Sequence, residues 1–514
     1  MSGGIVIGTE RTADLELSAD VCVIGSGAGG AVLAAGLAER GLSVVMLEEG
    51  GWYQRPDFTG QEEVAYPMLY QERGTRATAD LAITVLQGRS VGGGTTVNWT
   101  TCFRTPDRIL AHWRAVHGVE GVDPDAMRPH FEAVEARLGI EPWPEERVNR
   151  NNDVLLRGAR KLGWSVGLLN RNVRGCAGSG FCGMGCPLDA KQGMLLTYLP
   201  DAVAAGMVLH ADTRVERIEV VGQRVVAVHG RTVARDRDIA DGPRVVVRPR
   251  VTVLSAGAIN SPALLLRSGL GAGPVGRRTM LHPVVALSGL YADRVEAWNG
   301  APQSVASHEF VDRGPDKVGF FLETPPVHPM LAATALPVFG DRQRAFLSRL
   351  PYTATLIAIA VDGLLPGDDG GVVTLRPDGR SRLDYPTRPG LVEAWRAAHV
   401  AMAKLHFAAG AEAVVSNHVA ALGPLLGIDE IERLEAAPYG ALHHTAFSAH
   451  QLGGCAMGGS PETSVVDSNL RHWTVPNLFV VDGSVFPTGL GVNPSESIYG
   501  FAHRARDAVA AAAG

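Results

Sequence analysis

The sequence predicts an α/β fold in which an open-sheet domain is assembled from discontinuous segments and joined to an α+β lobe with a β-sheet of its own. Three observations support this prediction. A strand, a glycine-rich turn and a helix follow one another near the N-terminus. A similar strand and small-residue turn recur in the middle of the chain, and a third strand reaches a turn near the C-terminus. In such sheets, ligands bind at the carboxyl ends of the strands.

The N-terminal segment begins with an apolar run at 20–24, which is typical of a buried strand. The glycine-rich stretch 25–30 follows it directly, and Leu33 and Leu37 are then spaced one helical turn apart. Gly41 ends the helical pattern. These residues predict a strand, a tight turn and a helix.

A second apolar run, at 43–47, ends in Glu48. An acidic residue at this point can accept a hydrogen bond from an adenosine ribose. Gly25, Gly27 and Gly30 allow the backbone to approach a pyrophosphate, whose charge is favoured by the N-terminus of the helix. The segment therefore predicts dinucleotide binding.

The middle segment is rich in strand patterns. Residues 215–220 alternate in polarity, 224–229 follow a turn, and 244–254 form a third run, so we expect a small meander. The last run leads into small residues and then into a helix predicted over 259–269. This order repeats the strand and turn of the N-terminal segment.

The C-terminal segment brings a carboxylate to the end of a strand. The apolar run 478–481 leads directly to Asp482 and Gly483. Because ligands bind at the carboxyl ends of strands in open α/β sheets, this turn is expected to face a ligand.

A helix start is predicted shortly after that turn. Asn493 is expected at the N-cap, Pro494 at the first helical position, and Glu496 where a capping box needs an acid. A helix that begins there directs its positive end toward a ligand.

Two further patterns lie between these segments. Three successive glycines, Gly92 to Gly94, precede hydroxyls and an amide, which suits a backbone that passes close to a flat ring or to phosphates. From 127 to 168 the pattern is helical, with Phe131, Val134 and Leu138 on one face. That block is interpreted as an insertion.

Composition restricts the class of protein. A chain of 514 residues suggests about two to four domains. The formal net charge of −6 and the absence of a basic stripe argue against binding to nucleic acid or anionic membranes. The longest apolar runs are too short to span a bilayer, and the N-terminus lacks a signal-peptide pattern, so we expect no transmembrane segment and a cytoplasmic location. Oligomeric state cannot be predicted.

Six cysteines are few for this length and do not predict a disulfide scaffold. Cys176, Cys182 and Cys186 lie close together in one loop. Their spacing matches no standard metal pattern, and a fourth ligand is missing nearby. A packed or redox-sensitive loop is therefore favoured over the alternative of a metal site, and we expect no metal.

The order of motifs resembles a known family. GSGAGG with LEEG, then GRSVGGGTTVNW, LSAGAINSPALLLRSGL, HQLGG, VVDGSVFP and GVNP are similar to the glucose–methanol–choline family of FAD-dependent oxidoreductases and span nearly the whole chain. VGGGTTVNW and the cysteine loop most resemble the long-chain alcohol oxidase branch. HQLGG and GVNP resemble cholesterol oxidases.

The resemblance implies how the chain divides. A Rossmann-like FAD-binding domain would combine residues 15–105, 200–290 and 441–514. The substrate-binding lobe would combine residues 106–199 and 291–440. The isoalloxazine ring would lie between the two.

Oxidation of an alcohol on a flavin requires a group that accepts the hydroxyl proton while hydride passes to flavin N5. Histidine is suitable because its unperturbed pKa is about 6.5. The resemblance assigns this role to His450, and it assigns to Asn493 a hydrogen bond to the alcohol or the developing alkoxide. The alternative for Asn493 is an N-cap role alone.

The resemblance also implies the FAD site. Asn98 would lie beside the flavin, Asp482 would contact the ribityl or pyrophosphate portion, and Val215 would touch adenine. Some relatives carry a histidine bonded to flavin where this chain has Val97, so FAD is expected to be non-covalent. The residues expected to bind the cofactor are Gly25, Gly27, Gly30, Glu48, Gly92, Gly93, Asn98, Val215, Asp482, Gly483 and Pro494.

The most favoured function is FAD-dependent oxidation of an alcohol to an aldehyde or ketone. The substrate would be a primary and long-chain or otherwise apolar alcohol, and oxygen would be the acceptor. The alternative is a dehydrogenase that passes electrons to a quinone or another acceptor and acts on a sugar, sterol or polar alcohol. A third hypothesis is a flavin redox sensor without alcohol turnover, which the presence of both His450 and Asn493 argues against.

Overall fold

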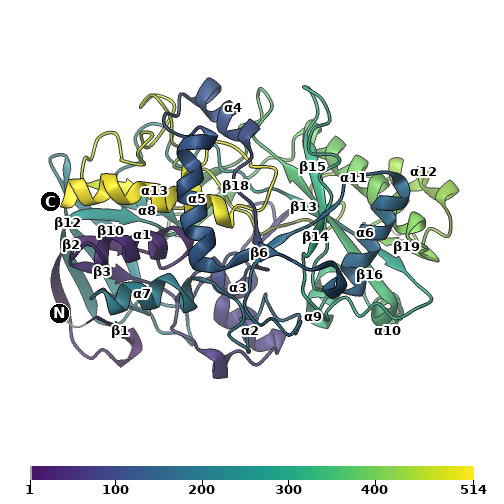
Figure 1. Cartoon of the computed structure of the whole chain (residues 1–514), viewed down its shortest axis with the longest axis horizontal. Helices are drawn as coiled ribbons and strands as arrows, with labels where there is room; N and C mark the ends of the chain where they lie inside the picture. The colour runs from purple at the N-terminus through teal and green to yellow at the C-terminus, as the bar shows by residue number, and fades with distance from the viewer. Residues whose placement is uncertain (1–2, 421) are drawn as a thin grey trace.

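The computed structural model describes residues 3–420 and 422–514. Two large sheets occupy opposite ends of the molecule, and both chain termini lie beside the first (Figure 1). The first sheet has the order β1-β9-β3-β2-β12-β11-β10, with β21 beside β12. Its strands are β1 (Gly4–Val6), β2 (Leu15–Ile24), β3 (Val44–Leu47), β9 (Val208–His210), β10 (Thr213–Val221), β11 (Arg224–Thr232), β12 (Arg244–Leu254) and β21 (Leu478–Val480).

The centre of the first sheet is parallel. Strand β2 pairs in parallel with β3 on one side and with β12 on the other, and β21 pairs in parallel with β12. Residues 21–24 and 44–47 are all buried, as expected for parallel strands that are covered on both faces. The carboxyl ends of β2, β3, β12 and β21 therefore meet at one edge.

Helices cover this sheet. Helix α1 (Ala28–Ala38) packs against α7 (Tyr198–Ala204) and α13 (Ser495–Ala513) (Figure 1), and α8 (Asn260–Arg267) packs on β10. Helix α1 is buried along almost its whole length because it consists of small and apolar residues. The predicted strands and helices of all three segments are thus present within one domain.

The second sheet has the order β15-β16-β13-β20-β4, with β19 beside β13. Helices α6 (Arg150–Leu162) and α11 (Pro389–Ala408) pack against it. Its strands are β4 (Thr84–Val85), β13 (Val284–Leu290), β15 (Gly319–Glu323), β16 (Thr353–Val361), β19 (Ala413–Ser416) and β20 (Phe447–Ser448). The predicted fold class, an α/β domain of discontinuous segments plus an α+β lobe with a sheet, is confirmed.

The predicted division of the chain stays a prediction. Strands β4, β13 and β20 of the second sheet come from segments that the division assigns to the FAD-binding domain. The polypeptide therefore crosses between the sheets several times, and both sheets contribute to the space between them.

Shorter elements complete the fold. The insertion contains α5 (Pro124–Leu138), where Phe131, Val134 and Leu138 are buried as predicted. The other elements are α2 (Glu62–Leu69), α3 (Gly94–Val97), α4 (Asp107–His117), α9 (Pro329–Ala335), α10 (Asp341–Ser348), α12 (Glu432–Glu435), β5 (Thr101–Cys102), β6 (Ile140–Pro142), β7 (Gly167–Leu168), β8 (Asn170–Asn172), β14 (Val305–Ala306), β17 (Val372–Leu375) and β18 (Ser381–Asp384). Within residues 3–420 and 422–514, no helix is long and apolar enough to cross a bilayer.

The predicted capping of the last helix is wrong. Helix α13 begins at Ser495, with Pro494 at the N-cap and no capping bond from its side chain. The Asn493 amide instead contacts buried groups, and Glu496 interacts with the carboxyl of Glu135. Buried partners outside the helix thus replaced the local capping bonds that sequence spacing suggested.

Candidate active site

A cavity of about 1100 Å³ lies between the two sheets and is lined by residues of both. The first sheet contributes the turns after β2, β3, β12 and β21, which are the carboxyl strand ends that sequence patterns predicted. The second sheet contributes one face of β13 and β16. The predicted residues at its wall are Gly25, Gly27, Glu48, Gly93, Asn98, Val215, His450, Asp482, Gly483, Asn493 and Pro494.

Two glycine turns meet at the wall of this cavity. Gly25 has φ +100°, and a Cβ there would lie 2.3 Å from the carbonyl oxygen of Ser255. A Cβ on Gly93, which has φ +53°, would lie 2.7 Å from Cα of Gly27. Only glycine fits such close backbone approaches. Because the two turns are in contact, they form one continuous backbone surface.

Two other predicted glycines are not at the wall. A Cβ on Gly30 would lie 2.1 Å from the carbonyl oxygen of Gly25, so this glycine allows α1 to pack close to the turn. Gly92 has φ +94°, and its N–H donates to Ser26 Oγ at 3.0 Å. Gly92 thus joins the two turns, Gly30 packs α1 against its own turn, and neither lines the cavity.

Glu48 is tied into the first turn. Its Oε2 accepts hydrogen bonds from the backbone N–H and the hydroxyl of Ser26, at 2.9 and 2.7 Å, and Oε1 accepts from Gly50 N–H at 2.8 Å. Burial raises the pKa of Glu48 to about 7, although these hydrogen bonds oppose the shift. The carboxyl group is therefore rigidly placed at the end of β3.

Asp482 joins the middle and C-terminal segments. Its Oδ2 accepts from Gly257 N–H at 2.8 Å and from the Ser261 hydroxyl at 2.5 Å, and Oδ1 accepts from Ser484 N–H at 2.8 Å. Burial raises the pKa of this carboxyl, against the effect of the same bonds. The strand ends of β12 and β21 are thereby held together at the wall.

His450 and Asn493 face the cavity from different elements. His450 follows β20, and Asn493 precedes α13. The Asn493 Nδ2 lies 3.4 Å from His450 Nε2 and 3.3 Å from Glu323 Oε2. The sequence prediction paired these two residues, and the structure brings them into contact.

Two groups beside this pair were missed in the sequence. His282 Nδ1 lies 3.3 Å from His450 Nδ1, and its Nε2 accepts a hydrogen bond from Leu490 N–H at 2.9 Å. Glu323 is fully buried at the end of β15 and also accepts a hydrogen bond from Gln303 Nε2. An acid that ends an apolar run is the same signal that singled out Asp482, so Glu323 could have been found.

Burial sets the charge states around the pair. It lowers the pKa of His450 to about 4 and holds that of His282 well below its ordinary value, so both imidazoles are neutral at neutral pH. Burial raises the pKa of Glu323 to about 8, which favours the neutral carboxylic acid. The site around Asn493 therefore has little net charge.

Two family models described as GMC oxidoreductase match residues 66–284 and 367–502. An uncharacterized GMC-type oxidoreductase of Mycobacterium tuberculosis is 37% identical over 491 residues, which cover 94% of this chain and 74% of that protein. The chain belongs to the GMC oxidoreductase family.

Other relatives of this GMC oxidoreductase include a long-chain-alcohol oxidase of Arabidopsis thaliana, FAO4A, which is 31% identical over 95% of this chain and 68% of its own length. A formate oxidase of Aspergillus oryzae, whose structure was determined to study FAD modification, superposes with a TM-score of 0.72 at 14% identity, covering 98% of this chain and 99% of that one. The chain is thus an FAD-dependent oxidoreductase that acts on alcohol-type donors.

The cavity of this GMC oxidoreductase fits FAD. The contacting glycine turns leave backbone rather than side chains at its wall, and α1 and the long helix α13 both begin there. The side-chain oxygens of Asn98 and Asn493 are buried and accept no hydrogen bond from another described residue. Such unpaired acceptors are suited to donors of a bound molecule.

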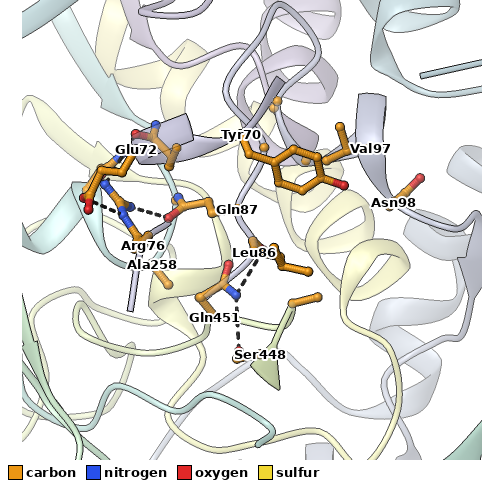
Figure 2. A pocket seen from close by; sticks show the side chains of 18 of the residues that line it. Tyr70, Glu72, Arg76, Leu86, Gln87, Val97, Asn98, Ala258, Ser448 and Gln451 are labelled. Atoms are coloured by element: carbon orange, nitrogen blue, oxygen red, sulfur yellow. Dashed lines mark hydrogen bonds and ion pairs between the residues drawn. The ribbon is translucent and has the colours of Figure 1, made fainter. Parts of the chain in front are cut away.

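Figure 2 shows the cavity wall that the segment after α2, the segment around Gln87 and the residues around β20 provide. The Arg76 guanidinium donates to Glu72 Oε1 at 3.0 Å and to Gln87 Oε1 at 2.6 Å. Gln451 donates to Leu86 O at 3.4 Å and to Ser448 Oγ at 3.2 Å. The Gln451 bonds connect the turn that carries His450 to Leu86 and to β20.

The cysteine loop packs behind α3. Cys176, Cys182 and Cys186 are free thiols, and burial raises the pKa of Cys182. Lys191 Nζ donates to the carbonyl oxygens of Cys182 and Asn98, at 2.6 and 2.8 Å, and so ties the loop to the cavity wall. Across the described ranges, no group of three or more His, Cys, Asp or Glu residues is arranged to hold a metal ion.

Proposed function

We propose that this GMC oxidoreductase oxidises a primary alcohol with an extended apolar chain to an aldehyde, with oxygen as the electron acceptor. The observation that carries the proposal is the composition of the cavity beyond His450. Its lining there is mainly aliphatic and aromatic, and includes Val284, Ala286, Val327, Leu331, Leu336, Phe346, Ile357, Ile359 and Phe447. Such a lining favours an alkyl chain over a sugar, whose hydroxyls need hydrogen-bond partners.

The alcohol would bind with its hydroxyl beside His450 and Asn493. Because the pKa of His450 is lowered to about 4, the ring is neutral at neutral pH and can accept the hydroxyl proton. The Asn493 Nδ2, which lies 3.4 Å from His450 Nε2, would donate a hydrogen bond to the alcohol oxygen and hold it in place. FAD, when bound, supplies the acceptor for the hydride of the carbinol carbon.

The residues that would hold FAD are those at the contacting turns and strand ends. Gly25, Gly27 and Gly93 would offer backbone to the pyrophosphate and the ring, and Glu48 would meet the ribose. The N-terminus of α13 at Pro494 would face the part of the ring where negative charge develops. Val97 excludes a covalent bond by histidine at that position, so the cofactor is proposed to be non-covalent.

The test is a panel of alcohols under air, with flavin absorbance and hydrogen peroxide measured together. The panel includes n-alkanols of increasing length, sugars and sterols. We expect flavin bleaching and peroxide with the n-alkanols. Bleaching without peroxide would instead assign an acceptor such as a quinone, and a preference for sugars or sterols would contradict the proposed substrate class.

A further inference from the structure

One face of the second sheet forms a strip along the cavity. In the antiparallel register of β13 and β16, Val284 pairs with Ile359, Ala286 with Ile357 and Ser288 with Thr355. All six residues line the cavity, because alternate residues of a strand face the same side. At about 3.3 Å per residue, the strip from the first pair to the last is about 13 Å long.

The strip begins beside the proposed reaction centre. Phe447 pairs with Val284, and His450 follows three residues later in the chain. Ser288 and Thr355 therefore lie at the end of the strip that is remote from His450. An extended substrate that placed its hydroxyl at His450 would direct its other end toward this pair.

A short helix lines the same cavity as the strip. Leu331, Ala332 and Ala335 of α9 line the same cavity. The N-terminus of α9 is held by Glu62, whose carboxylate accepts hydrogen bonds from Met330 N–H at 2.6 Å and Leu331 N–H at 2.8 Å. The residues that α9 adds to the cavity lining are apolar, like Ala286 and Ile357 in the middle of the strip.

The remote end is polar. Ser288 Oγ and Thr355 Oγ1 lie 2.9 Å apart, and only 5% and 6% of these residues is exposed. The bond between them uses one of the two hydroxyl protons, so one donor and several lone pairs are left for a further partner. An alkyl terminus would leave these groups unpaired, which is unfavourable.

We propose that Ser288 and Thr355 form a distal subsite that binds a second polar group, so that the preferred substrates are alcohols whose apolar chain ends in another hydroxyl. This inference rests on the proposed function. The alkyl middle of such a molecule lies on the Ala286 and Ile357 pair, and its far hydroxyl both donates to and accepts from the distal subsite.

The experiment compares each n-alkanol with the α,ω-diol of the same carbon number by anaerobic flavin reduction, which separates the dissociation constant from the reduction rate. A diol has two ends that can react, so its measured efficiency is divided by two before it is compared with that of the n-alkanol. We expect the ratio of reduction rate to dissociation constant to favour the diol about three- to tenfold at one chain length, as for one neutral hydrogen bond, and less at shorter and longer chains.

The variant S288A/T355V removes both hydroxyls with little change of volume. We expect the diol preference to disappear through weaker binding of the diol, while reduction by the n-alkanol is unchanged or faster. Thr355→Ser keeps a hydroxyl and should retain the preference. Thr374→Val, on β17 and away from the cavity wall, controls for a general loss of stability.

A diol preference that does not depend on chain length would overturn the distal subsite, and so would a preference that persists in S288A/T355V. Neither result would contradict the proposed function, which is the oxidation of alcohols. If no alcohol reduces the flavin, the proposed function fails instead. The subsite is then tested by binding alone: the diol must raise Tm of the wild-type holoenzyme more than the n-alkanol does, and equal shifts would overturn it.

Discussion

At the scale of single residues, His450 is the group whose environment matters most for the proposed reaction. We expect His450→Ala to slow anaerobic flavin reduction by about 10² to 10⁴-fold while FAD stays bound, because general-base catalysis is lost. Asn493→Ala should have a smaller effect. Stopped-flow absorbance measures the rate, and the flavin spectrum before mixing verifies cofactor content. An unchanged rate in the His450 variant would refute its role.

The contact between His282 and His450 suggests a second experiment, which distinguishes a base from a hydrogen-bond donor at His450. Leu490 N–H donates to His282 Nε2, so the proton of neutral His282 lies on Nδ1, the atom that faces His450 Nδ1. In that arrangement the proton of neutral His450 lies on Nε2, from which it would donate a hydrogen bond to the alcohol oxygen. The base role at Nε2 instead requires the other tautomer, in which His450 Nδ1 does not accept from His282. His450→Gln keeps an N–H donor but has no basic nitrogen. A rate as low as that of His450→Ala identifies a base, and a rate well above it identifies a donor.

Glu323 is predicted to make stability depend on pH. Its folded pKa of about 8 lies above the ordinary value of 4.5, so the folded protein binds more protons than the unfolded chain between these values. Its contribution to stability is therefore fully present below about pH 4.5 and is lost as the pH rises through 8. Glu323→Gln should flatten the dependence of Tm on pH in this range. A parallel pH profile for the variant and the wild type would contradict the assignment.

At the scale of elements, the two glycine turns depend on each other. We expect Gly93→Ala to destabilise the holoenzyme by about 1 to 3 kcal/mol and to weaken FAD binding, because its positive φ is strained and its Cβ would meet Gly27 backbone. Gly167→Ala, where a Cβ would meet nothing within 4 Å, is the matched control. Thermal unfolding and flavin titration measure the two effects. Equal behaviour of the two variants would show that the turns do not need to touch.

Sequence patterns located most elements of the first domain because each is encoded locally. Buried strands such as 20–24 and the glycine turn after them need no distant partner to be recognised. The start of α13 was misplaced because capping patterns count local bonds only. Asn493 had buried partners at Glu323 and His450, and tertiary contacts overrode the local preference.

At the scale of the whole molecule, FAD is proposed to be held by many contacts from three distant segments and by no covalent bond. Acid precipitation destroys all of these contacts at once, so we expect yellow flavin in the supernatant. Absorbance of the supernatant and of the redissolved pellet measures the partition. Yellow colour that stays with the pellet would show that flavin is covalently attached, through a residue at a position other than 97.

The sequence alone determined the family motifs and the strands and helices of the first domain, because spacing and residue type carry that information. The roles of His450 and Asn493 came from the resemblance to the family. Only the tertiary structure decided that Glu323 and His282 join that pair, and that Ser288 and Thr355 lie at the far end of the channel. These contacts join residues far apart in the chain, and the burial that shifts the pKa values of Glu323, His282 and His450 exists only once the two sheets enclose the cavity.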